Sequence, residues 1–85
     1  MAPIVTGVYL MRVYANRHGD SGVQAFEFDA TSITVEFPQG WKYLYNDIKP
    51  GPQHVEEMKK LATDGAGLNG YINKFVRSNY ARKYQ

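Results

Sequence analysis

The sequence predicts an α+β fold: an antiparallel β-meander of three to four strands, followed by two C-terminal α-helices packed on one face of the sheet. Apolar and polar residues alternate in the first half of the chain, most clearly from Ile33 to Phe37, as in half-buried strands. Short turns between these segments favour antiparallel pairing. In the second half, apolar residues recur at helical spacing. A chain of 85 residues forms one domain with a thin core.

The predicted strands follow one another closely along the chain. Residues 5–14 carry apolar side chains on both faces, so they form either a strand with two covered faces or an added edge strand. Gly, Asn, Asp and Ser between residues 16 and 22 indicate a loop. Residues 23–28 and 33–37 then alternate as strands around a turn at 29–32.

Three aromatic rings alternate along the next strand, directly after a Pro38-Gln39-Gly40 turn. Alternate residues of a strand share a face, so Trp41, Tyr43 and Tyr45 stand in one row. Such a row is either part of the core or a platform on which a ligand stacks. We favour the packing role, with Tyr43 the most buried, and expect Tyr45 to be the ring that meets a ligand if any does.

Two helices are predicted after the Pro50-Gly51-Pro52 stretch, with Pro52 in the first helical turn. Asp64 to Gly67 ends the first helix, and Asn69 is expected to cap the second. The apolar faces of both helices need a partner, and the sheet supplies it. The predicted core contains either Phe26 or Phe28 together with Ile33, Val35, Phe37, Tyr43, Met58, Leu61, Ile72, Phe75 and Val76.

The stretch from Ser21 to Arg77 resembles the KTSC domain, which is named for the C-terminal segment of some lysyl-tRNA synthetases and also occurs as a small stand-alone bacterial or phage protein. The matching residues are Thr34-Val35-Glu36-Phe37, Gly40, Tyr43-Leu44-Tyr45, Gly65, Asn69 and Ile72. The function of this family is not established, and RNA binding has been suggested from its association with a synthetase. The family often has Arg directly after the last of these residues, where this chain has Asn73 and carries Arg77 one turn later.

The uneven charge distribution suggests that the C-terminal half of the chain binds a ligand. Between residues 49 and 85, seven Lys and Arg residues face three Asp and Glu residues, and no acid follows Lys74. We divide the chain into an N-terminal extension (1–20), the KTSC-like domain (21–80) and a basic tail (81–85). Basic residues interleaved with aromatic ones suit RNA or single-stranded nucleic acid. The expected binding residues are Tyr45, Lys74, Arg77, Tyr80, Arg82 and Lys83. A helix C-terminus also favours cations, which is the alternative account of Arg77.

Other function classes have less support. The chain has no Cys, and His18 and His54 are not spaced as metal ligands, so we expect no catalytic residues, metal site or cofactor. Its apolar N-terminal run is too short to span a membrane, and we expect a soluble cytoplasmic protein without a membrane partner. The sequence therefore favours a small non-catalytic binding module. The alternative is a protein-interaction or self-association module, a homodimer for example, in which residues 1–20 supply an exposed edge strand.

Overall fold

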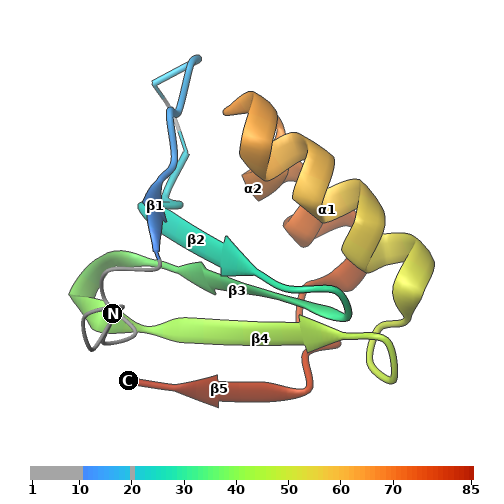
Figure 1. Cartoon of the computed structure of the whole chain (residues 1–85). Coiled ribbons are helices and arrows are strands. Elements are labelled where there is room, and N and C mark those ends of the chain that lie inside the picture. The colour runs from blue at the N-terminus through green and yellow to red at the C-terminus, as the bar shows by residue number, and fades with distance from the viewer. Residues whose placement is uncertain (1–10, 20) are drawn as a thin grey trace, which may run out of the picture.

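The computed structural model describes residues 11–19 and 21–85 and has five antiparallel strands and a helical layer (Figure 1). The sheet has the order β1-β2-β3-β4-β5. Its strands are β1 (Arg12–Val13), β2 (Ala25–Phe28), β3 (Ser32–Glu36), β4 (Lys42–Asn46) and β5 (Arg82–Tyr84). A 3-10 turn, η2 (Pro38–Gly40), joins β3 to β4. The helices are α1 (Pro52–Asp64), α2 (Leu68–Tyr71) and a π-helical segment, η3 (Ile72–Val76).

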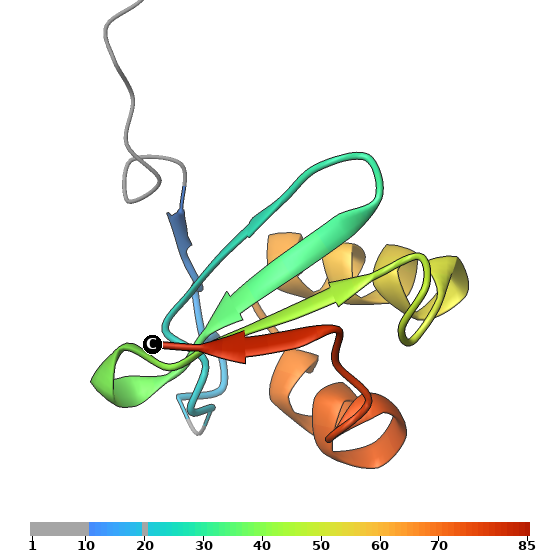
Figure 2. The same ribbon diagram turned by 90° about the horizontal axis from the view of Figure 1, so that it is seen from below.

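The predicted α+β class is confirmed, but the C-terminal end differs from the prediction. The chain turns back after the helices, so that residues 82–84 form β5 beside β4 rather than a basic tail (Figure 2). The backbone N–H of Ala81 donates to the carbonyl of Leu44, 2.8 Å away, and leads the chain into this pairing. The reason is that β4 would otherwise leave its outer N–H and C=O groups unpaired. At the other edge, β1 covers Arg12–Val13, and residues 5–10 of the predicted first strand lie outside the described part.

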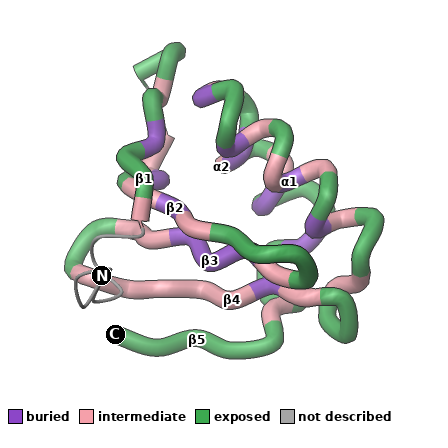
Figure 3. Tube along the Cα trace, viewed as in Figure 1, coloured by how far each residue is buried: buried purple, intermediate pink, exposed green. Residues whose placement is uncertain are grey.

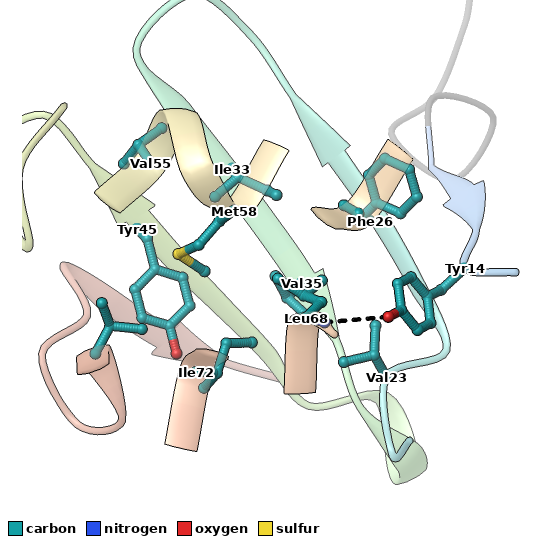
Figure 4. Packing of buried hydrophobic residues seen from close by; sticks show 12 residues of the cluster. Tyr14, Val23, Phe26, Ile33, Val35, Tyr45, Val55, Met58, Leu68 and Ile72 are labelled. Atoms are coloured by element: carbon teal, nitrogen blue, oxygen red, sulfur yellow. Dashed lines mark hydrogen bonds between the residues drawn. The ribbon is translucent and has the colours of Figure 1, made fainter. Parts of the chain in front are cut away.

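The helices cover one face of the sheet, as predicted, and α1 packs against β3 and β4 (Figure 1). The register aligns Phe26 with Val35 and Ile33 with Tyr45, so that these four side chains share the helix-facing side. Buried residues accordingly lie where the sheet and the helices face each other (Figure 3). Together the buried residues form one core of Tyr14, Val23, Phe26, Ile33, Val35, Tyr45, Val55, Met58, Ala62, Leu68, Ile72 and Val76 (Figure 4).

Most of the predicted core is confirmed, with Phe37, Tyr43 and Leu61 partly buried against it. Phe75 is the error, because its side chain is 52% exposed. The α-helical period that placed Phe75 inward is lost after Tyr71, where the backbone widens to a π-helix and the Arg77 N–H donates to the carbonyl of Ile72. This widening changes which residues of the last turn face the sheet. Tyr14 lies outside the predicted domain and yet belongs to the core.

The turn between α1 and α2 was predicted at the right residues. Pro52 opens α1, and α1 ends at Gly65, whose φ of 82° is left-handed and whose N–H donates to the carbonyl of Leu61. The expected cap at Asn69 is wrong, because Gly67 precedes α2 and Asn69 lies within it. The first N–H of α2 instead finds its acceptor on the Tyr14 hydroxyl, far away in the sequence.

Candidate nucleic-acid interface

The aromatic row of Trp41, just before β4, and Tyr43 and Tyr45, within it, has one buried ring, Tyr45, and two half-buried ones. Tyr45 has no exposed surface, and its hydroxyl donates to the carbonyl of Arg77 at 3.4 Å. Removal from water raises the pKa of this phenol. Figure 4 shows Tyr45 between β4 and the helical layer, close to Ile72. The expectation that Tyr45, rather than Tyr43, is the ring open to a ligand is therefore wrong, since the helical layer covers the end of β4 that carries Tyr45.

Tyr43, two residues before Tyr45 on β4, is less buried than Tyr45. Other aromatic rings hold its side chain in place. Its ring packs edge-on against Phe37, with centroids 5.3 Å apart, and against Tyr80, with centroids 5.1 Å apart. Tyr80 also contacts the ring of Tyr45, at 6.5 Å. Tyr80, in the segment before β5, therefore has a structural role, since it packs against both Tyr43 and Tyr45. The sequence alone did not distinguish this role from base stacking. Tyr43 itself is half-buried.

Lys83 lies directly over this row. The register of β5 places Lys83 opposite Tyr43, and its ammonium is 5.3 Å from the centroid of the Tyr43 ring and 4.8 Å from that of Trp41. Both distances fall in the range of cation–π attraction. The structure therefore gathers a cation and two rings on one side of the sheet.

Arg77 approaches Tyr43 from the helical layer. A pocket of about 210 Å³ opens between β4 and η3, and its lining is Phe37, Tyr43, Tyr45, Ile72, Asn73 and Arg77. Tyr43 thus belongs both to this pocket and to the cluster around Lys83. We call Trp41, Tyr43, Arg77 and Lys83 together the Tyr43 surface.

Two of the predicted binding residues lie elsewhere. Arg82 pairs with Leu44, so its side chain is on the face away from the helices, where it stacks 5.3 Å from the ring of Tyr84. Lys74 lies 5.3 Å from the ring of Phe75 and does not line the pocket. Because neighbouring residues of a strand point to opposite faces, a strand at 82–84 separates Arg82 from Lys83. Residues 82–84 carry no strand signal of their own, so the sequence did not predict this separation.

The cations of the Tyr43 surface form no ion pair with any described carboxylate. Within residues 11–19 and 21–85, the ion pairs are Glu36 with Lys42, Glu56 with Lys59 and Glu57 with Lys60. Arg77 and Lys83 therefore have no carboxylate partner in the described part of the chain. Both are exposed, so both can meet an anion without breaking an existing pair.

Sequence reasoning missed three residues here. Trp41 was recognised in the row but not assigned to binding, and Phe37 was placed in the core only. Asn73 was noted as a departure from the KTSC pattern, with no role assigned. No local signal in the sequence pairs Asn73 with Arg77, because the α-helical period is lost in η3 and Arg77 follows the last residue of that segment.

The described residues contain no group of three or more His, Cys, Asp or Glu side chains placed to hold a metal ion. No helix within them is long and apolar enough to cross a membrane. Comparisons of the chain with protein-family models, with curated proteins and with solved structures give no match. The resemblance to the KTSC domain therefore stays a prediction.

Proposed function

We propose that this protein is a small non-catalytic module that binds single-stranded nucleic acid, RNA in particular, through the Tyr43 surface. The observation that carries the proposal is the position of Lys83 over Trp41 and Tyr43 without a carboxylate partner among the described residues. Rings beside unpaired cations match an unpaired nucleotide, because the base stacks on a ring and the phosphate meets a cation. The cytoplasmic location and the KTSC resemblance are predictions that agree with this function.

Base stacking and phosphate contacts both contribute to the expected affinity. One stacked base contributes about 1–3 kcal/mol, and each phosphate contact adds an electrostatic contribution that depends on salt. Two bases on Trp41 and Tyr43 would contribute roughly 2–6 kcal/mol together, and phosphates at Arg77 and Lys83 would add a contribution that falls as salt rises.

The test is fluorescence anisotropy of a labelled ten-nucleotide RNA, with salt raised from about 50 to 200 mM. We expect binding that weakens steeply with salt. Lys83→Ala and Arg82→Ala form a matched pair, since each removes one positive charge from β5 but from opposite faces. Lys83→Ala should weaken binding about fivefold and reduce the slope of log affinity against log salt concentration by about 0.7. The affinity of Arg82→Ala should stay within about twofold of wild type. No binding at low salt, or equal losses in both variants, would refute the proposal.

A second function, self-association, is favoured by the sheet face that the helices leave uncovered. Val13, at the β1 edge, is 84% exposed, and Tyr84, at the β5 edge, is 37% exposed. The register places both on the side away from the helices, in line with Ala25. Sedimentation equilibrium of wild type and Val13→Asp would decide this: a dimer that the substitution dissociates supports self-association, and a monomer at all concentrations excludes it.

A further inference from the structure

The pocket between β4 and η3 has two chemically different sides. Its aromatic side is formed by Phe37 and Tyr43, which belong to the sheet layer, and its polar side by Asn73 and Arg77, which belong to the helical layer. The volume of about 210 Å³ is some seven times the share of one water molecule in the liquid, about 30 Å³. The pocket is therefore larger than a single water site and has room for a small planar ligand.

Asn73 is one of the two residues on the polar side of the pocket. Its side chain is exposed and makes no hydrogen bond to any residue within 11–19 and 21–85. Its neighbour Ile72 is buried in the core, which fixes the backbone that carries the amide. An amide offers a donor and an acceptor side by side, so it can form two hydrogen bonds with one edge of a base.

Arg77 supplies a different chemistry at the same pocket. It follows Asn73 by four residues, and its backbone carbonyl accepts the hydroxyl of Tyr45. This hydrogen bond ties the end of η3 to β4. The guanidinium is exposed and without a carboxylate partner in the described part of the chain, so it can take the phosphate of the nucleotide whose base enters the pocket.

We infer that this pocket binds a single nucleobase, adenine by preference, and that Asn73 reads the edge of that base. The inference rests on the proposed function and adds base selectivity to it. Asn73 would meet the Hoogsteen edge of the base. Adenine alone presents a donor (N6) beside an acceptor (N7) on that edge, which the Asn amide pairs with through two hydrogen bonds, whereas guanine presents two acceptors there. A correct pairing of this kind is worth about 1–3 kcal/mol of discrimination, which corresponds to roughly 5- to 150-fold in affinity.

The experiment uses the full chain and a ten-nucleotide oligouridine in which one central nucleotide is U, A, C or G, with binding measured by anisotropy at about 50 mM salt. We expect the adenine-containing RNA to bind at least fivefold more tightly than the other three. Asn73→Ala should abolish that preference and leave the affinity for oligouridine within about twofold of wild type. Asn79→Ala is the matched control, because Asn79 is also exposed and lies outside the pocket; it should keep the preference.

The proposed function and the base-reading role of Asn73 give distinguishable negative results. If no oligonucleotide binds, the proposed function falls, and the inference falls with it. If all four bind equally, or if the preference persists in Asn73→Ala with a native circular dichroism spectrum, the nucleic-acid function stands and the reading role of Asn73 is refuted.

Discussion

The hydroxyl oxygen of Tyr14 accepts a hydrogen bond from the backbone N–H of Leu68 across 3.2 Å, and both residues are buried. The bond joins the segment after β1 to the first residue of α2, 54 positions later (Figure 4). It satisfies an N–H at the start of a helix that no side-chain cap serves. Tyr14 therefore fixes the helical layer that carries Asn73 and Arg77 relative to the sheet.

Replacing Tyr14 by Phe keeps the ring and removes the acceptor. The N–H of Leu68 would stay buried without a partner, so we expect the free energy of unfolding to fall by about 1–3 kcal/mol. Urea denaturation followed by circular dichroism measures the change. Tyr84→Phe is the control, because Tyr84 is 37% exposed, and it should change stability by less than about 0.5 kcal/mol. Equal effects in the two variants would show that the Tyr14–Leu68 bond contributes nothing.

The glycine that ends α1 is predicted to be irreplaceable by Ala. Gly65 has a φ of +82°, and a Cβ there would lie 2.5 Å from the Cβ of Ala15. The left-handed backbone and the overlap together should lower the free energy of unfolding of Gly65→Ala by about 2–4 kcal/mol. Gly70→Ala is the matched control within α2, since an added Cβ meets nothing within 4 Å, and it should stabilise by about 0.5–1 kcal/mol. Thermal unfolding of both variants would show shifts of opposite sign; a neutral Gly65→Ala contradicts the packing described.

The buried phenol of Tyr45 predicts a loss of stability at alkaline pH. Burial raises its pKa in the folded protein, whereas an unfolded tyrosine ionises near pH 10. Stability from the neutral phenol is thus complete below pH 10 and is lost as pH rises above it. Between pH 9 and 11, wild type should lose on the order of 1 kcal/mol more than Tyr45→Phe. Denaturant midpoints at these two pH values give the comparison, and parallel losses in both proteins would contradict it.

Removing the last strand should destabilise the fold. Deletion of residues 82–85 takes away the pairing with β4, the contact of Lys83 with Trp41 and Tyr43, and the hydrogen bond from Gln85 to the carbonyl of Gln39. Together these contribute on the order of 1–3 kcal/mol. Urea denaturation should show this loss, and fluorescence of Trp41 should report a more exposed indole. A truncated chain as stable as wild type would mean that β5 is only loosely attached.

Local patterns in the sequence were enough to predict the central strands, the two helices and the break between them. Ile33 and Val35 alternate with polar residues and are buried as predicted, since a strand with one covered face has no other way to place them. Pro52 and Gly65 likewise mark the ends of α1 through their own backbone preferences. These predictions were correct because the strand pattern and the helix ends depend on residues only a few positions apart in the chain.

The candidate site depended on contacts that no local pattern encodes. Residues 82–84 have no strand signal of their own, and only the unpaired edge of β4 draws them into the sheet, which puts Lys83 over Trp41 and sends Arg82 to the other face. The widening of the helix at η3 turns Phe75 outward and leaves Arg77 at the pocket beside Asn73.

By itself, then, the sequence determined the α+β class, the row of rings on β4 and the basic character of the C-terminal end. Which ring is buried and which cations lie beside an accessible one was decided by the tertiary structure alone. Tyr45 is fully buried and Tyr43 only partly buried, because the helical layer covers the end of β4 that carries Tyr45. Burial depends on what packs from a distance, whereas strand and helix periods depend on neighbours in the chain.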